Sequence, residues 1–208
     1  MAPVTKKRPA RTEEPLTGIP GVLAALHKEI RYCRVCPTMK PHRKGPRRAS
    51  GGNRDTGYFL ATSSPQPVPL LEQALEALND ERFRKLTDLF YIVHAVRCVP
   101  TRPDDKQRAR APAPAECRAC HSFIDFETRL LHPRLIVAVG APAARSLLGE
   151  DFRITRDHGV RQVLPHTRVI PLIEPSPRSS AALRQKGLTL TRYRSWLTGF
   201  LGSLVDTL

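Results

Sequence analysis

Five cysteines stand at three places along the chain, and their spacing is typical of a metal centre. Two C-x2-C pairs, Cys33/Cys36 and Cys117/Cys120, lie on either side of a single cysteine, Cys98. In a reducing compartment, clustered thiols bind metal more often than they form disulfides. The pattern therefore indicates a bound cofactor but does not indicate which reaction the protein catalyses.

These cysteines allow two different four-thiol sites. The two C-x2-C pairs together would make a structural zinc site. The first pair with Cys98 and either Cys117 or Cys120 would make the site of an iron–sulfur cluster. Spacing alone does not choose between the two. A cluster would join the segment after the N-terminal helix to the loop after the second predicted strand, which is an architectural role.

A second group of polar residues follows the apolar runs of the chain. Its members are Ser63, Ser64, Pro65 and Gln66 after the first run, His94 near the end of the second, and Glu174 and Ser176 after the fourth. In open parallel sheets, ligands bind at the carboxyl ends of the strands. Turn chemistry alone also brings Ser and Pro to such places. The position therefore favours a binding site without specifying its chemistry.

The apolar runs also predict the framework that positions these residues. They are apolar on both faces and alternate with helical patterns, as expected for buried parallel strands with helices on both sides of the sheet. The predicted strands are 58–62, 90–96, 135–140 and 169–173, and the predicted helices are 22–31, 70–78, 120–131, 141–148, 179–185 and 192–205.

The charge of the chain favours a polyanionic partner. Lys and Arg exceed Asp and Glu to give a net charge of +15 and a pI near 10.4. Such an excess promotes binding to nucleic acid through counterion release, although solubility or a biased genome composition is an alternative cause. Six cations fall in an irregular loop over residues 37–56, namely Lys40, Arg43, Lys44, Arg47, Arg48 and Arg54.

The chain ends and its hydropathy suggest one domain with a tail. Residues 1–20 are basic and proline-rich without periodic apolar positions, so we expect a disordered tail followed by one domain over 21–208. No apolar run approaches the roughly 20 residues of a membrane span. The start also lacks a hydrophobic signal core. We expect a monomer in the cytoplasm or nucleoid, with no membrane partner.

The chain resembles the uracil-DNA glycosylase superfamily, specifically its iron–sulfur branches, families 4 and 5. The resemblance runs from about residue 33 to 187 and is carried by residues 91–100 (YIVHAVRCVP), 132–141 (HPRLIVAVGA) and 147–149 (LLG). It implies a three-layer α/β/α fold with a four-stranded parallel sheet. It also implies a [4Fe–4S] cluster, and counting back from Pro133 without a gap puts Cys120 on the fourth ligand. The implied ligands are Cys33, Cys36, Cys98 and Cys120.

The active-site motifs of that family are altered in this chain. Residues 62–66 read TSSPQ where the family has G-E-A-P-G, so Ser63 stands at the acidic position. His94 occupies the position of an Asn that helps to read the base, and Glu174 replaces the His of H-P-x-P. The family's G-R-P-F segment, whose aromatic ring stacks on the extruded base, is absent between residues 65 and 91.

The resemblance implies a DNA-binding DNA glycosylase that excises uracil or another damaged base by hydrolysing the N-glycosidic bond in base-excision repair. Glu174 would stabilise positive charge on the sugar, and His94 would donate to the leaving base or assist a water. The implied substrate-binding residues are Ser63, Ser64, Pro65, Gln66, Ser176 and Arg178. The second candidate donor is His158, in the loop 156–159.

Simpler roles for these residues remain open. Glu174 would cap the helix that follows it or pair with a basic residue, and His94 would be a satisfied core histidine. Ser176 would cap the same helix. On that interpretation the protein binds nucleic acid without catalysis, keeping the scaffold and the metal cluster. A zinc-stabilised nucleic-acid-binding protein that uses both C-x2-C pairs is the other alternative.

Overall fold

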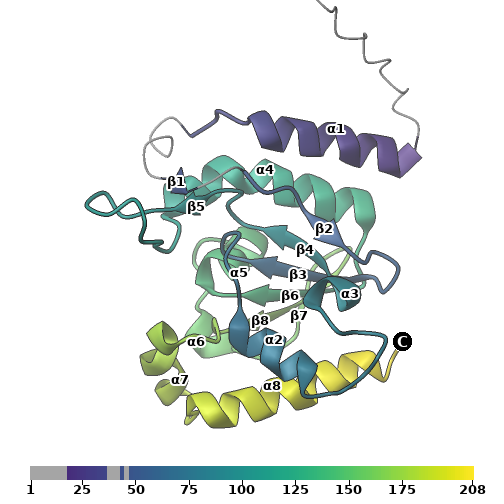
Figure 1. Ribbon diagram of the computed structural model, residues 1–208, viewed down its shortest axis with the longest axis vertical. Coiled ribbons are helices and arrows are strands. Elements are labelled where there is room, and N and C mark those ends of the chain that lie inside the picture. The colour runs from purple at the N-terminus through teal and green to yellow at the C-terminus, as the bar shows by residue number, and fades with distance from the viewer. Residues whose placement is uncertain (1–17, 37–42, 45–46) are drawn as a thin grey trace, which may run out of the picture.

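A mixed sheet at the centre of the molecule organises the fold, as seen in the computed structural model, which describes residues 18–36, 43–44 and 47–208 (Figure 1). Over these residues the sheet has six strands in the order β2-β4-β3-β6-β8-β7. The four inner strands are parallel and are those that the apolar runs predict: β4 (Tyr91–His94), β3 (Tyr58–Thr62), β6 (Leu135–Val139) and β8 (Arg168–Leu172).

The prediction of a four-stranded, wholly parallel sheet is wrong at the two edges, where the structure adds one antiparallel strand on each side. β2 (Gly51–Gly52) pairs with β4, and β7 (Gln162–Val163) pairs with β8, both in the antiparallel direction. Each edge strand has only two residues and neither is buried, so neither carries the apolar pattern by which a strand is recognised. A separate pair, β1 (Arg43–Lys44) with β5 (Val99–Pro100), is also antiparallel.

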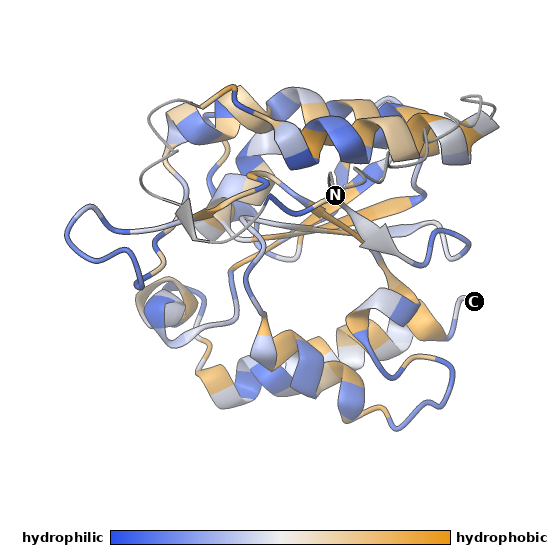
Figure 2. Cartoon of the chain, turned by 45° about the horizontal axis from the view of Figure 1, so that its top comes forward, coloured by the Kyte–Doolittle hydropathy of each residue, from blue (hydrophilic) through white to orange (hydrophobic). Residues whose placement is uncertain are grey.

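Helices cover both faces of the sheet, which confirms the predicted α/β/α layering. Along β3, Tyr58 and Leu60 pack with α2 (Pro69–Glu76), α3 (Leu86–Leu89) and α8 (Leu190–Val205). The alternate residues Phe59 and Ala61 pack with α4 (Pro114–Leu131) and α5 (Ala141–Leu148) on the other face. Successive residues of a strand point to opposite faces, so a strand covered on both faces is apolar throughout. Figure 2 shows this hydrophobic colouring in the strands and on the helices beside them.

The N-terminal helix adds an outer layer. α1 (Gly18–Tyr32) lies alongside α4 on the side away from the sheet (Figure 1). Its buried residues Leu23, Leu26 and Ile30 recur at helical spacing and meet Val96 and Phe123 in a third apolar cluster. This cluster also borders the cysteines.

The helix α4 begins at Pro114, ahead of the predicted start at residue 120. Pro114 stands in its first turn, where the missing N–H costs nothing, and Glu116 accepts a hydrogen bond from the backbone N–H of Ala113. Cys117 therefore lies inside the helix, one turn before Cys120. The short helices α3 and α6 (Ile154–Asp157) were not predicted, and the segment after β8 forms η2 (Pro177–Ser179) and α7 (Ser180–Gln185).

The predicted tail and much of the basic loop lie outside the described residues. Residues 18–20 form the start of α1, and residues 1–17 are not described. Of the six basic loop residues, the side chains of Arg47, Arg48 and Arg54 are described. Within the described part of the chain, no helix is long and apolar enough to cross a membrane.

Candidate active site and cysteine cluster

The five cysteines converge beside the apolar cluster that joins α1 to α4. Cys33 and Cys36 follow α1, Cys98 follows β4, and Cys117 and Cys120 lie on α4. Cys120 is a buried member of that cluster, and the other four cysteines pack against it. Segments far apart in sequence therefore bring their thiols to one place.

Three of the thiols act electrostatically on a fourth, Cys36. Burial, together with smaller contributions from the neighbouring Cys120, Cys33 and Cys98, raises the pKa of Cys36 to about 11. Burial also raises the pKa of Cys120, whose sulfur has hydrogen-bond contacts with the backbone of Arg97 and the thiol of Cys36.

Cys117 is not among the residues that raise the pKa of Cys36. Burial raises its pKa to about 11, with a smaller contribution from Cys120, and its sulfur has a hydrogen bond with Ser146 of α5. As the side chains stand, no three His, Cys, Asp or Glu residues of the described chain are arranged to hold a single metal ion.

A small pocket of about 160 Å³ lies at the carboxyl ends of β3, β6 and β8. It brings together five residues that the sequence predicts for the site: Ser63, Ser64, Gln66, Glu174 and Arg178. The Ser63 hydroxyl donates to the carbonyl of Val139 at 3.3 Å, and Gln66 Nε2 donates to Ser64 Oγ at 2.8 Å. The first bond fixes the loop after β3 against β6, and the second lies within the loop.

Gly140 permits the close approach of Ser63 and Glu174 in this pocket. It adopts φ +90°, a conformation that favours glycine. A Cβ atom there would stand 2.5 Å from Ser63 Oγ and 3.7 Å from Glu174 Oε2. Any larger residue at position 140 would therefore displace the Ser63 side chain.

His94 lines a neighbouring pocket of about 450 Å³, and Glu174 does not. The two pockets share the lining residues Thr62, Gln66, Pro67 and Val68, and Pro65 lines the larger one. From β4 to β8 the sheet has three strand intervals of ~4.8 Å, so His94 and the residues after β8 are separated by about 14 Å across the sheet. Ser176 lines neither pocket, and its hydroxyl is buried without a partner in the described chain.

The ionisation of His94 bears on its predicted role as a donor to the leaving base. Although part of the side chain is accessible, burial and, to a smaller extent, Arg97 lower its pKa to about 3. A group with such a pKa is neutral at physiological pH. His94 therefore does not act as an imidazolium acid at neutral pH.

Side chains hold both backbone groups of Ile173, the residue before Glu174. Tyr193 donates from its hydroxyl to the Ile173 carbonyl at 2.7 Å, and the Ile173 N–H donates to His158 Nδ1 at 3.2 Å. The His158 ring also packs edge-on against Tyr193 and tilted against Trp196. His158, predicted as a second candidate donor, thus uses Nδ1 to support the strand end, and the sequence gives no signal for Tyr193.

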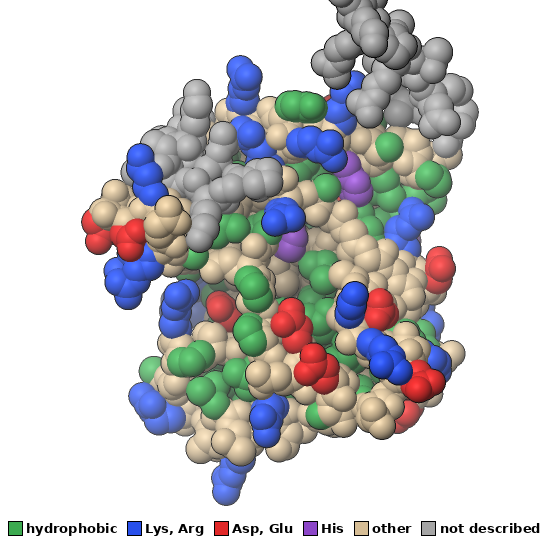
Figure 3. Space-filling view, viewed as in Figure 1, with side chains coloured by type: hydrophobic (Ala, Val, Ile, Leu, Met, Phe, Trp, Pro, Cys, Tyr) green, Lys and Arg blue, Asp and Glu red, His purple; other side chains and the backbone are tan. Residues whose placement is uncertain are grey.

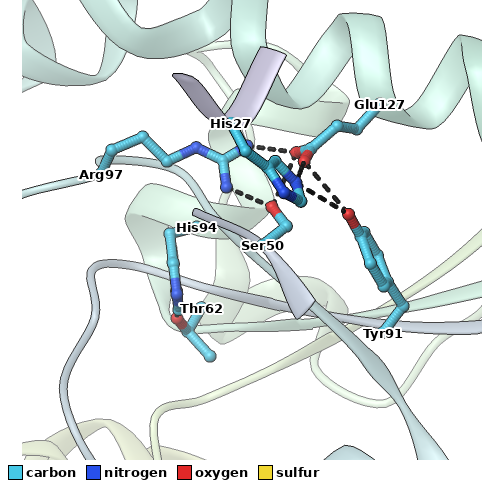
Figure 4. A network of polar contacts seen from close by, with 7 residues as sticks. All are labelled: His27, Ser50, Thr62, Tyr91, His94, Arg97 and Glu127. Atoms are coloured by element: carbon cyan, nitrogen blue, oxygen red, sulfur yellow. Dashed lines mark hydrogen bonds and ion pairs between the residues drawn. The ribbon is translucent and has the colours of Figure 1, made fainter. Parts of the chain in front are cut away.

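A buried polar network lies between α1, α4 and β4, and the sequence did not reveal it (Figure 4). Arg97 and Glu127, exposed by 1% and 0% of their side chains, form an ion pair. Arg97 also donates to Ser50, and Ser50 donates to Glu127 at 2.8 Å. His27 and Tyr91 complete the network through Glu127 Oε1, at 3.6 and 3.4 Å.

Exposed cations border the pockets. Arg48, Arg84 and Lys85 line the larger pocket and Arg178 lines the smaller one. Figure 3 shows basic side chains spread over one face of the molecule and interspersed with acidic ones. Such cations suit phosphates on either side of a bound nucleotide.

The comparison with protein families agrees with this architecture. A model described as the uracil DNA glycosylase superfamily matches residues 32–198. The matched range holds all five cysteines, the six-stranded sheet and both pockets. The chain belongs to the uracil DNA glycosylase superfamily.

Proposed function

We propose that this protein is a DNA glycosylase that hydrolyses the N-glycosidic bond of uracil or another damaged base. The proposal is supported by family membership together with one observation: a carboxylate, two serines and an arginine line a pocket at the strand ends, where ligands bind in such sheets. Members of this superfamily act on bases in DNA, and the excess of basic residues suits that substrate.

Breaking this bond requires the nucleotide to leave the base stack. The transition state carries positive charge on the sugar and negative charge on the departing base. Glu174 would stabilise the sugar from the smaller pocket, and Arg178 would contact a flanking phosphate. The neutral His94 would contact the base in the larger pocket rather than protonate it.

The test is base excision by anaerobically purified protein. Duplexes carrying uracil, hypoxanthine, xanthine or an oxidised base are incubated with the protein, and abasic sites are cleaved with alkali. We expect strand scission on at least one of them. Binding to all of them without scission on any would contradict the proposed reaction.

A non-catalytic nucleic-acid-binding role is the second candidate. It is favoured by Ser63, which stands where the family has an acidic residue. It is also favoured by Phe83 and Phe90, the two phenylalanines between residues 65 and 91, because both are buried in the core. Neither ring lines a pocket in which it would stack on a base. Binding without scission in the assay above is the result that this candidate predicts.

We also propose that Cys33, Cys36, Cys98 and Cys120 hold a [4Fe–4S] cluster. A set made only of thiols fits such a group, which is bound by four cysteine thiolates. Support comes from the contact between Cys36 and Cys120 and from the influence of Cys33 and Cys98 on Cys36. The cluster would join α1, β4 and α4, away from the strand-end pockets.

Serine substitutions distinguish this ligand set from a zinc site. We expect Cys98→Ser and Cys120→Ser to lose nearly all bound iron and the broad absorbance near ~400 nm, while Cys117→Ser keeps both. Metal analysis and absorbance spectra of the three variants provide the measurement. A colourless protein that binds zinc and depends on Cys117 rather than Cys98 would point instead to the two C-x2-C pairs.

A further inference from the structure

A third pocket lies between α4 and α5, apart from the two pockets at the strand ends. We call it the α4–α5 pocket. Its volume of about 550 Å³ falls in the range of small-molecule sites. Neither Glu174 nor His94 lines it. The reaction proposed for the strand-end pockets therefore leaves this pocket without an assigned ligand.

The three pockets follow one another along the carboxyl ends of the strands. The two strand-end pockets share four lining residues, and the smaller of them shares Pro112 with the α4–α5 pocket. Pro142, on the opposite wall, stands in the first turn of α5, just after β6. A DNA strand whose extruded nucleotide occupied the strand-end pockets would therefore reach the α4–α5 pocket past Pro112.

The apolar wall of the α4–α5 pocket suits the face of a base. It is formed by Pro112 and Pro114 before and at the start of α4, and by Pro142 and Leu147 of α5. Proline rings are rigid, and proline has no N–H group that a covering base would leave unpaired. We therefore expect this wall to contact a base by its face, which every type of base offers, rather than by its hydrogen-bonding edge.

Two exposed arginines provide positive charge in the same pocket. Arg145 donates from Nε to the carbonyl oxygen of Phe152 at 3.2 Å, and its terminal N–H groups have no hydrogen-bond partner among the described residues. Arg118 pairs with Glu150 at 3.1 Å, and both of these side chains are more than half exposed. Such an exposed ion pair contributes little to stability, so a phosphate can replace Glu150 as the partner of Arg118.

A base that enters this pocket must first leave the base stack. In a duplex it loses both its stacking and its pairing, whereas a base in a single strand has no partner to lose. A protein that holds two nucleotides of one strand out of the stack therefore binds single-stranded DNA more readily than duplex DNA.

We propose that the α4–α5 pocket binds a second, unstacked nucleotide of the DNA strand that carries the target base, and that it thereby favours single-stranded DNA. The prolines contact the base of this nucleotide, and Arg118 and Arg145 bind its phosphate. This inference rests on the proposed function and specifies its substrate class. The substrate is a single strand with a nucleotide on one side of the damaged one that occupies the α4–α5 pocket.

The first test measures the affinity for the substrate strand. Fluorescence anisotropy compares a labelled single strand, carrying uracil on a 2′-fluoro nucleotide that resists cleavage, with the same strand in a duplex. Abasic spacers then replace the flanking nucleotides of the single strand one at a time. We expect the single strand to bind more tightly than the duplex. We also expect a loss of about tenfold for a spacer at one position on one side of the uracil.

The second test connects that position to the pocket. In Arg145→Glu we expect about tenfold weaker binding of the single strand and no further loss from the sensitive spacer, because a repelled phosphate no longer places its base between the prolines. The control is Arg129→Glu, which makes the same change on an exposed residue of α4 that pairs with Asp125 and lines none of the three pockets. It should keep the affinity and the spacer effect. Thermal unfolding checks that both variants fold.

The outcomes separate this inference from the proposed function. An equal spacer effect in Arg145→Glu and the unaltered protein, the absence of any sensitive position, or tighter binding of the duplex would overturn the subsite while leaving the excision assay to decide the reaction. A sensitive position that is lost in Arg145→Glu and kept in Arg129→Glu would support the subsite. It would do so even if no base were excised, and the subsite would then belong to the non-catalytic candidate.

Discussion

Replacing Glu174 with Gln is expected to slow abasic-site formation by about 10²–10³-fold without unfolding the protein. The substitution keeps the size of the side chain and removes its negative charge. Glu174 lines the pocket with Ser63 and Arg178, and it is the one acidic residue among the residues lining that pocket. No other described carboxylate there would replace it in stabilising positive charge on the sugar.

The control for this prediction is Glu29→Gln. Glu29 is exposed on α1, far in the fold from the strand ends, and the substitution makes the same chemical change. We expect excision by this variant to match the unaltered protein. Single-turnover excision and thermal unfolding should be measured on all three proteins. Equal rates for Glu174→Gln and the unaltered protein would show that Glu174 is not the working carboxylate.

The support for Glu174 comes from its surroundings as much as from its charge. Tyr193 and His158 bind the backbone carbonyl and N–H of the preceding residue, Ile173. Gly140 leaves room for the side chain beside Ser63. A catalytic group is effective when such neighbours hold it in place before the substrate arrives. Because its neighbours hold it in place, Glu174 is better suited to catalysis than an unsupported acidic residue at a strand end would be.

The framework of the site could be predicted from the sequence because its signals are local. The strand Tyr58–Thr62 and the helix Ala141–Leu148 have the bounds predicted for them. In both, burial on a repeated face leaves an apolar pattern in the residues themselves. The same argument places Ser63 and Glu174 at the carboxyl ends of two strands, β3 and β8, where they line one pocket.

Features that depend on contacts between distant residues could not be predicted. The separation of His94 from Glu174 follows from the strand order, in which β3 and β6 lie between their strands. The low pKa of His94 follows from burial and from Arg97. The edge strands β2 and β7 exist only through pairing with longer neighbours, and two residues carry no periodicity.

The buried network connects the cysteine region to the larger pocket, which His94 lines. Arg97 lies between His94 and Cys98 in the chain and interacts electrostatically with the ring of His94. Its backbone contacts Cys120, and its side chain pairs with Glu127 on the same helix as Cys120. A change at Glu127 should therefore affect the fold on both sides of β4.

Substituting Glu127 with Ala is expected to be the most destabilising single change in the described part of the protein, by about 3–5 kcal/mol. The reason is the buried guanidinium of Arg97, which would lose its counter-charge in a place that water does not reach. Against a typical total stability of about 5–15 kcal/mol, such a loss leaves a marginal fold. Urea denaturation followed by circular dichroism measures it.

The pH dependence of the stability provides a second test of the Arg97–Glu127 ion pair. Burial alone would raise the pKa of Glu127, but His27, Arg97 and Ser50 hold it below its usual value. A carboxyl whose pKa is lower in the folded state stabilises the fold above its unfolded pKa. That stabilisation is lost as the pH falls through the folded value. Glu127→Gln should therefore reduce the dependence of stability on pH in the acidic range.

The matched control is the double variant Arg97→Met with Glu127→Leu. It removes both charges and keeps apolar volume, so no buried charge is left without a partner. We expect it to recover at least half of the stability lost in Glu127→Ala, with part of the deficit remaining because Ser50 and Tyr91 lose their acceptor. If Glu127→Ala unfolds at the same urea concentration as the unaltered protein, the ion pair is not what joins α1 and α4 to the sheet.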